Sequence, residues 1–478
     1  MAVTTLTPSV TKVATEYNYL NSLDLAEGLH KPEVDNVYVQ RYGRQDITGF
    51  IEFMGNKKGI NAIEFNHYEQ ERIHGVVRLS ASAATASGSG VTLAGTAAAG
   101  YTYNYSGQSP YPTSDTFSTN TLSQYDSIQV NGFEMLVTAV NGNAFSAIST
   151  DSSATRPNVL TTDDIIILGN AMPEGSSAPA SRNGRMISYT NYLQIQRRTH
   201  RVTGTEMGVQ TWIEVEGKNG QKGYFWYLQG INDEYQRFLN EREATLIAGN
   251  DIANNAAGLA GVGSLSVGDA NSITKTKGLI PQISADGNVE AYTSGSFALT
   301  DLENMVKNLQ KYRGSKKNML YCGHNFKLDV DALILENTNL SNGGVSWAEF
   351  TGAGEQGIRF SIDKVEYGQF EFGLQVMDIF SDPNFLGYAG GIYNEIGIVC
   401  PIDDTVSYNS RNSSTAVTVP SMRLNFLDSN DGGRDYKEWV SGVGMGAATS
   451  GDDFFDVHML SHTGLECFAL NRYGLFVG

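Results

Sequence analysis

The segment from Asn191 to Gly249 places the strongest constraint on what this chain can fold into. A strand-like run at Tyr192–Ile195 and a turn-rich segment at Val202–Thr205 lead into one long amphipathic helix, predicted over residues 222–248. No catalytic motif lies nearby. Apolar side chains recur along the predicted helix at alternating steps of three and four residues: Tyr224, Leu228, Ile231, Tyr235, Phe238 or Leu239, and Leu246. This pattern is typical of a structural spine.

The charge balance excludes one large class of function. The 478 residues carry 51 acidic against 33 basic side chains, for a formal net charge of −18. The basic residues that do cluster form only doublets, Lys57-Lys58, Arg197-Arg198 and Lys316-Lys317, which are expected to be solvated surface pairs. Because an acidic chain is repelled by phosphate backbones unless it gathers basic residues locally, sequence-specific binding to nucleic acid is not expected.

The cysteines and the longest apolar run indicate the cellular compartment of the protein. Cys322, Cys400 and Cys467 are far apart and odd in number, which argues against a disulfide framework and against a cysteine-based zinc site. The longest aliphatic run near the middle, Ile165–Leu168, is far shorter than the ~20 residues of a membrane span. The N-terminus shows no pattern of an export signal. We therefore expect a soluble protein of a reducing cytosol, without a membrane partner.

The composition changes abruptly at Ala81. Residues 81–179 are poor in charge, and Arg156 is the only basic residue between Ala81 and Ala180. Within this stretch Asn131-Gly132 and Asn141-Gly142 are type I′ hairpin signals between strand-like runs. We predict an inserted small β-domain at residues 81–179. For residues 81–118, which are dominated by Ala, Ser, Thr, Gly and Tyr, a low-complexity linker is the alternative.

A second helix is predicted from a capping pattern. Thr300 and Glu303 are spaced as a capping box, and the helix they open carries an apolar face and stops at Gly314. A short strand at 319–322 and a helix at 325–335 follow. Alternating segments then predict a β-rich C-terminal third, at residues 360–367, 370–380 and 392–399.

Three motifs could carry chemistry, and each has a plainer interpretation. Gly442–Ala447 has dinucleotide-type glycine spacing without a following amphipathic helix, so a loop is favoured. Asp428–Gly433 begins like a calcium loop, but its twelfth position is Trp439 instead of a glutamate, so an Asx-rich turn is favoured. His458 and His462 would share a metal only if the segment were helical, and it equally fits a strand. We predict no catalytic, cofactor or metal site.

The order of these elements resembles that of the major capsid proteins of tailed bacteriophages of the Hong Kong 97 type. Residues 137–143, 167–171 and 174–175 resemble the β-insert of some members, and residues 191–195 with 202–205 resemble the approach to their spine helix. The insert and the segment Thr463–Cys467 resemble crAss-like phages in particular. The resemblance implies an α+β fold with an N-arm at 1–45, an E-loop at 46–80 and 180–221 around the insert at 81–179, a peripheral domain with the spine helix at 222–318, an axial domain at 319–420, and a returning β segment at 421–478.

The resemblance also implies a function. Such proteins self-assemble into hexamers and pentamers of an icosahedral shell that encloses double-stranded DNA, as structural and not enzymatic components. It implies portal, scaffold and decoration or head-fibre partners, no cofactor, and a place in the virion capsid after assembly in the host bacterial cytoplasm. The alternatives are another self-assembling protein, such as a phage tail tube or sheath or a surface-array protein, and an enzyme using the residues from Asp452 to His462.

Overall fold

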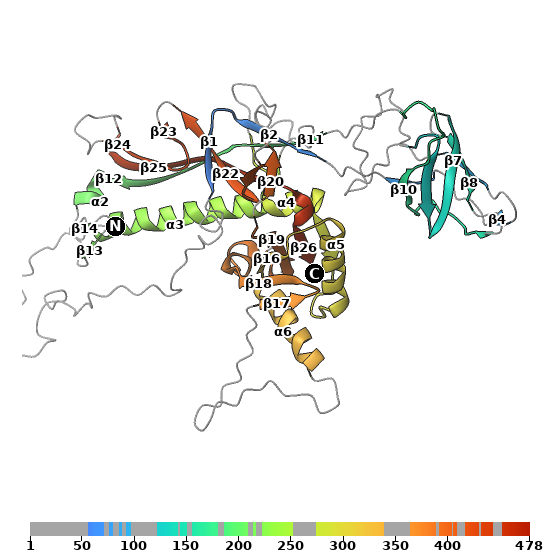
Figure 1. Cartoon of the computed structure of the whole chain (residues 1–478). Helices are drawn as coiled ribbons and strands as arrows, with labels where there is room; N and C mark the ends of the chain where they lie inside the picture. The colour runs from blue at the N-terminus through green and yellow to red at the C-terminus, as the bar shows by residue number, and fades with distance from the viewer. Residues whose placement is uncertain are drawn as a thin grey trace, which may run out of the picture.

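The strands of this chain gather into several sheets, three of which have six strands each among the described residues (Figure 1). The computed structural model describes residues 56–70, 76–79, 86–87, 92–96, 122–141, 144–150, 155–179, 186–208, 214–216, 222–251, 274–338, 364–388, 392–403, 405–408, 416–429, 432–442 and 452–478. The N-arm predicted at 1–45 lies outside these residues.

The first sheet supports the long helix, and we call it the spine sheet. Its strands run in the order β1 (Lys57–Ile60), β22 (Met422–Ser429), β25 (Phe454–Cys467) and β12 (Gln194–Thr203), with β23 (Gly432–Gly433) paired to β22 and β24 (Lys437–Gly442) paired to β25. The helix α3 (Phe225–Ala248) lies along one face of this sheet, as Figure 1 shows. Phe238 of α3 packs against Val457 and Met459 of β25, which fixes the helix on the sheet.

The second sheet contains the C-terminal strand, and we call it the terminal sheet. Its order is β15 (Asn288–Ala291), β26 (Gly474–Val477), β19 (Ile396–Pro401), β16 (Lys317–Cys322), β18 (Phe370–Val376) and β17 (Lys364–Tyr367). Every residue of β19 is buried, as expected for a central strand that is covered on both faces. The helices α5 (Leu299–Lys311) and α6 (His324–Thr338) cover one face through Met305, Leu309 and Phe326.

A shared core joins the two sheets. The end of α3, the helix α4 (Leu279–Asp286), and side chains from both sheets, such as Leu424, Leu465 and Ile398, belong to one buried cluster. The short elements around this body are α2 (Gly204–Gly208), β13 (Glu214–Glu216), β14 (Lys222–Tyr224), β20 (Thr405–Tyr408), β21 (Ala416–Val419), η1 (Asp378–Phe380), η2 (Leu386–Tyr388), η3 (Ile392–Glu395) and η4 (Leu470–Arg472).

The two sheets divide the chain differently from the predicted boundary between residues 318 and 319. The strand β15 and the helix α5 precede that boundary, yet they belong to the terminal sheet and its helical layer. The strand β26 also joins this sheet, although it falls in the segment predicted as a separate β return. The reason is that sheet pairing is set by contacts far apart in sequence, which a linear division of the chain does not capture.

An antiparallel pair of strands, which we call the arm, projects from the spine sheet. It consists of β2 (Glu64–Gln70) and β11 (Met186–Tyr192), in register from Glu64 opposite Tyr192 to Gln70 opposite Met186. The residues between the two arm strands hold the third six-stranded sheet, which lies apart from the body in Figure 1.

This third sheet, the insert sheet, has the order β3 (Val76–Val77), β10 (Ile165–Asn170), β6 (Asp126–Val130), β7 (Phe133–Asn141), β8 (Ala144–Ser149) and β5 (Thr92–Thr96), and the pair β4 (Ala86–Ser87) and β9 (Thr155–Arg156) lies beside it. Ile128, Met135 and Ile165 form part of its own core. Because Val76 and Val77 pair with β10, the β-domain begins before the predicted Ala81. The strand β5 falls in the stretch for which a linker was the alternative.

The first predicted hairpin turn is confirmed, whereas Asn141 of the second predicted turn is a strand residue. Val130 pairs with Phe133 across Asn131 and Gly132, whose φ angles of 50° and 80° fit a type I′ turn. Asn141 instead belongs to β7 and pairs with Ala144, and the two residues between them lie outside the described part of the chain.

Candidate functional site: the joint between arm and body

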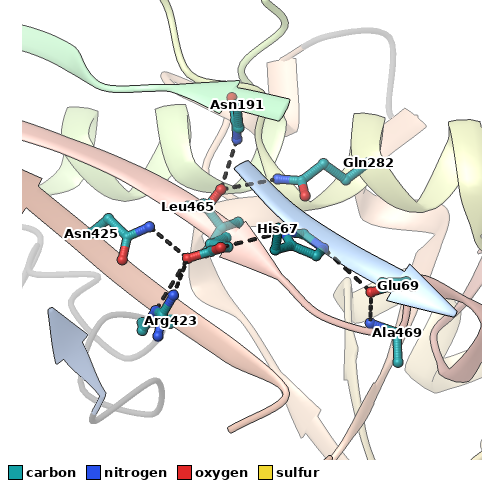
Figure 2. Close-up of polar contacts among 9 residues, drawn as sticks. His67, Glu69, Asn191, Gln282, Arg423, Asn425, Leu465 and Ala469 are labelled. Atoms are coloured by element: carbon teal, nitrogen blue, oxygen red, sulfur yellow. Dashed lines mark hydrogen bonds and ion pairs between the residues drawn. The ribbon is translucent and has the colours of Figure 1, made fainter. Parts of the chain in front are cut away.

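The base of the arm is anchored by alternate residues of β2. Phe65, His67 and Glu69 point toward the body, whereas Tyr68 points away and is 68% exposed. Because alternate residues of β2 face the body, one side of the arm forms a polar contact with β22 and β25 (Figure 2). We use the name arm joint for this cluster, which consists of His67, Glu69, Asn191, Arg423, Asn425 and Glu466.

His67 is the centre of the arm joint. Its Nδ1 lies 3.3 Å from Oε1 of Glu466, and its Nε2 lies 3.3 Å from Oε1 of Glu69. The ring stacks on Tyr189 of β11, with centroids 5.3 Å apart. Burial by itself would lower the pKa of His67, but the two carboxylates outweigh it and raise that pKa to about 9. The imidazole is therefore a cation at neutral pH, held between two anions.

Glu466 of β25 receives bonds from three directions. Arg423 donates through Nη2 at 2.6 Å and Nε at 3.1 Å, and Asn425 donates through Nδ2 at 2.7 Å, while His67 approaches from the arm. Burial would raise the pKa of this carboxyl, which is only 3% exposed, but these partners lower it to about 2. The arm joint thus contains two cations and two carboxylates in balance.

Four further hydrogen bonds tie the arm to Ala469, to β25 and to the residues just before α4. Oε1 of Glu69 accepts a 2.6 Å bond from the backbone N–H of Ala469, a residue with a left-handed φ of 54°. Asn191 of β11 donates through Nδ2 to the carbonyls of Leu465 and Lys277, at 2.7 and 3.0 Å, and accepts from the Lys277 amide at 2.9 Å. Figure 2 shows Asn191 and Gln282 converging on the Leu465 carbonyl.

The arrangement is suited to holding the arm in a fixed direction. Its buried charges are paired, and the removal of any partner would leave an uncompensated charge away from water. Because the contacts come from β2, β11, β22 and β25 together, they fix the direction in which the arm leaves the body. The arm joint is therefore a bracket that holds the base of the arm.

Some side chains of the apolar face predicted for the spine helix are among the described residues. Phe238 and Leu246 are buried, each 1% exposed, and Ile231, Tyr235 and Leu239 are half-buried. Tyr224 lies in β14, before the helix begins at Phe225, so its assignment to the helix was wrong. The reason is that residues 222–224 pair with 214–216 as a hairpin, which overrides their helical spacing. The side chain of Leu228 lies outside the described residues.

Ion pairs add to the packing of α3 on the spine sheet. Arg198 forms a two-pronged pair with Glu241, and Gln196 donates to Thr245 at 2.8 Å. Lys57 contacts Asp435 at 2.6 Å, and Arg242 of α3 binds the same carboxylate. One member of two of the basic doublets is thus engaged in a partly buried ion pair, so these doublets are not merely solvated.

The predicted capping box is wrong in its register. The helix α5 begins at Leu299 with Ala298 as N-cap, and Oδ2 of Asp301 accepts from the Ala298 N–H at 2.9 Å. Thr300 lies inside the first turn, and Glu303 accepts instead from Tyr367 at 2.8 Å and Lys307 at 3.2 Å. The alanine at the N-cap has no side-chain oxygen to offer, so the sequence pattern pointed to the nearest threonine.

The predicted stop at Gly314 also differs in detail. The helix α5 ends at Lys311, and the left-handed position is occupied by Arg313, with a φ of 55°. The amide of Gly314 donates to the Leu309 carbonyl at 2.6 Å, and that of Arg313 donates to Gln310 at 3.1 Å. These are the two bonds of a Schellman motif, so Gly314 closes the helix one residue beyond the left-handed position.

The structure separates the two candidate metal-binding histidines. His458 and His462 both lie in β25, where four residues span roughly 13 Å, too far for one ion. The ring of His458 bonds to Thr199 and Ser441, at 3.1 and 2.8 Å. Burial lowers the pKa of His462 to about 4, and Arg434 acts in the same direction. Within the described residues, no group of three or more His, Cys, Asp or Glu is arranged to hold a metal ion.

The other two motifs lie partly outside the described residues. Asp428 and Ser429 belong to β22 and pair with Gly433 and Gly432, so the calcium-like motif spans a hairpin. Gly442 ends β24 with a φ of 123°, and residues 443–450 are not among those described. No helix in the described part of the chain is both long enough and apolar enough to cross a membrane.

The fold and the arm joint define a class: a structural protein with a long spine, a projecting arm and a bracket that sets the arm's direction. Comparison with protein families makes the class specific, because residues 57–374 match the model of the SU10 major capsid protein. The chain belongs to this family. It is a structural component of a tailed-phage capsid, which confirms the predicted capsid role and the α+β fold of the Hong Kong 97 type, in preference to a tail or surface-array protein.

Solved structures with a low level of similarity include other capsids. The capsid protein of a native GTA particle is 9% identical with a TM-score of 0.39, and the alignment covers 96% of this chain and 99% of that chain. A Mycobacterium phage Cain structure is 9% identical with a TM-score of 0.39, covering 93% and 91%. A holo-SrpI encapsulin complex from Synechococcus elongatus is 7% identical with a TM-score of 0.32, covering 62% and 77%. A search of curated proteins found no match. The family assignment rests on the family match.

Proposed function

We propose that this chain tiles an icosahedral head as hexamers and pentamers, and that the arm joint aims the arm at a neighbouring subunit. The arm then serves as the E-loop of the Hong Kong 97-type fold, the spine sheet with α3 as its peripheral domain, and the terminal sheet as its axial domain. The observation that carries this proposal is the bracket of His67 between Glu69 and Glu466, since a rigid joint has value only if the arm must meet a fixed target.

The outward face of the arm supports contact with a neighbour. Tyr68 stands 68% exposed on β2, opposite Ser188 on β11. An aromatic ring with a polar edge is favoured at contacts between subunits. Each such contact is small, and many of them around a closed ring make the shell stable through multivalency.

The partners follow from the same role. We propose that the shell meets a portal, a scaffold, and decoration or head-fibre proteins, encloses double-stranded DNA without reading its sequence, and assembles in the host bacterial cytoplasm without catalysing a reaction. The net charge of −18 supports an inner wall that does not adhere to DNA. The insert and the segment Thr463–Cys467 support an origin in a crAss-like phage.

The test is assembly of the purified chain, imaged by negative-stain microscopy. Closed shells are expected, and tubes, flat lattices or a strictly monomeric protein would contradict the proposal. The variant Tyr68→Asp should leave the subunit folded, because the side chain is exposed, while it strongly reduces shell yield. Tyr68→Phe, which keeps the ring, is the matched control and should assemble.

A further inference from the structure

An apolar cavity of about 340 Å³ lies between the terminal sheet and the two helices that cover one face of it. The helix α5 lines it with Leu299 and Leu302, and the helix α6 lines it with Val330 and Leu333. Phe372 of β18 is among the sheet residues that line it. Ligand pockets have volumes of roughly 300–1,000 Å³ and mostly hydrophobic linings, so this cavity has the size and character of a binding site.

Three phenylalanine rings form the buried end of the cavity. Phe297 precedes α5, Phe326 belongs to α6 and Phe476 belongs to β26, and none of them is more than 6% exposed. The ring of Phe297 meets those of Phe326 and Phe476 edge-on, with centroids 5.2 and 5.4 Å apart. Aromatic pairs in this arrangement are favourable beyond the area they bury, and a further ring in the cavity would join the cluster in the same way. The buried end therefore favours an aromatic occupant.

The other end of the cavity opens to the surface at the edge of the terminal sheet. Val365 and Tyr367 lie on β17, the last strand on that side, and both are half-buried. Leu299, the first residue of α5, is 37% exposed. Because solvent already reaches the side chains around this mouth, a small molecule can enter without opening the core.

The lining offers no polar partner to a ligand. Among the described residues that line the cavity, the hydroxyl of Tyr367 is the one polar side-chain group. It already donates a 2.8 Å hydrogen bond to Glu303, which also pairs with Lys307 at 3.2 Å. A charged ligand would lose its hydration here and gain no partner, and apolar cavities of this kind stay free of water. The lining thus selects an uncharged, apolar occupant.

The charges next to the lining disfavour an anion further. Lys327 and Lys364 each adjoin a lining residue in sequence, and they pair with Asp331 and Glu371, at 2.7 Å in both cases. Carboxylates outnumber these two lysines among the residues that adjoin the lining: Asp301, Glu303, Asp329, Asp331, Glu366 and Glu371. An anionic amphiphile such as a fatty acid would therefore meet a field of its own sign.

We propose that the apolar cavity is a binding site for an uncharged aromatic molecule of about two or three rings. An engineered cavity of about 150 Å³ with a similar lining holds benzene, and this cavity of about 340 Å³ has room for a molecule roughly twice as large. The bound molecule fills the space between α5 and α6 and stabilises the folded subunit by mass action. The site lies within one copy of the chain, so it does not depend on the proposed function.

Two fluorescent probes with the same ring skeleton test the chemistry of the site. N-phenyl-1-naphthylamine is uncharged, whereas 8-anilino-1-naphthalenesulfonate carries a sulfonate on that skeleton, and both brighten in apolar surroundings. Titration of the purified full-length chain should show saturable binding of the uncharged probe and at least about ten-fold weaker binding of the sulfonate, because the charged group finds no partner in the cavity. Equal or tighter binding of the sulfonate would contradict an uncharged ligand.

Tryptophan substitutions test the location of the site. Val365→Trp fills the mouth and should weaken binding of the uncharged probe at least about ten-fold. Glu366→Trp places the same side chain on the exposed face of β17, so it is the matched control and should bind like the unaltered chain. Leu299→Trp blocks the mouth from the helix side at a partly exposed position, and it serves as the second variant if Val365→Trp fails to fold. Circular dichroism establishes which variants are folded.

Thermal unfolding gives a readout that is independent of fluorescence. A saturating amount of the uncharged probe should raise the melting temperature of the unaltered chain and of Glu366→Trp, but not that of the mouth-filling variants. Absence of binding, or binding that the folded mouth-filling variants leave unchanged, would overturn the proposal. Binding to the unassembled chain that disappears in assembled shells would assign the cavity to a neighbouring copy and would also overturn it.

Discussion

Glu69 in β2 accepts a 2.6 Å hydrogen bond from the backbone N–H of Ala469, a residue 400 positions later in the chain. The bond holds Ala469 in its left-handed conformation, at the point where the chain leaves β25 for η4 and β26. The arm is thereby coupled to the path that leads into the terminal sheet. Changes at the arm joint are therefore expected to affect the body of the subunit as well as the arm.

The charge of His67 predicts a loss of stability at alkaline pH. Its pKa is raised in the folded chain from 6.5 to about 9, so its contribution is fully present below about pH 6.5 and is lost as the pH rises through about 9. The contribution is on the order of 3 kcal/mol. Thermal unfolding between pH 6 and 10 should show a steeper alkaline decline for the unaltered chain than for His67→Gln. The same slope for both would contradict the assignment, and His324→Gln at an exposed histidine is the control.

The lowered pKa of Glu466 predicts a loss of stability at acidic pH. Its pKa is lowered in the folded chain from 4.5 to about 2, so its contribution is present above about pH 4.5 and is lost as the pH falls toward 2. Glu466→Gln leaves Arg423 without its anion and His67 with Glu69 alone, and it should lower the free energy of unfolding at neutral pH by about 3–5 kcal/mol. Chemical denaturation measures this change. Glu438→Gln, at an exposed glutamate, should cost much less, and an equal cost for both variants would refute the role of Glu466.

We expect substitution of Asn191 to weaken the arm locally. Asn191→Ala removes the bonds to Leu465 and Lys277. Gln282 still donates to both carbonyls, but the Lys277 amide loses its acceptor, which should cost about 1–3 kcal/mol. Limited proteolysis should then cut faster near β2 and β11 than elsewhere. Asn66→Ala, on the exposed side of β2, is the matched control. Unchanged cleavage in the Asn191 variant would show that the arm is held by other contacts.

We expect the effects of substitutions at Gly230 in α3 and His200 in β12 on stability to be coupled. A Cβ at this position would lie 2.3 Å from Cε1 of His200 on β12, so the glycine lets the helix and the strand approach. Gly→Ala inside a helix ordinarily stabilises by roughly 0.5–1 kcal/mol. Here Gly230→Ala should destabilise, and the double variant with His200→Ala should recover the loss. A double-mutant cycle in denaturant measures the coupling, and simple additivity would contradict the close approach.

The large elements could be predicted from local pattern, because their signal lies within one segment. The spacing of Ile231, Tyr235 and Phe238 indicates the helix, and Asn131-Gly132 indicates its hairpin directly. The start of α5 was less predictable. Its N-cap is Ala298, a residue type that is disfavoured at this position, and Asp301 accepts a hydrogen bond from the Ala298 N–H.

The arm joint could not be predicted from the sequence. His67 and Glu69 do show a period of two next to buried Phe65, which is the signal of a strand edge facing the body. Their partners Glu466 and Ala469, and the Arg423 that pairs with Glu466, lie hundreds of residues away along the chain. Only the pairing of β22 with β25 brings these charges to the arm, and that pairing has no counterpart in local spacing.

The strand β26 lies between β15 and β19, in the interior of the terminal sheet. During synthesis, β15 and β19 therefore wait for Gly474–Val477 before their backbone groups can pair across that gap. A ribosome that stalls earlier would release a chain whose terminal sheet has an open interior. The terminal sheet can therefore close only around Gly474–Val477, which makes these four residues essential to a finished subunit.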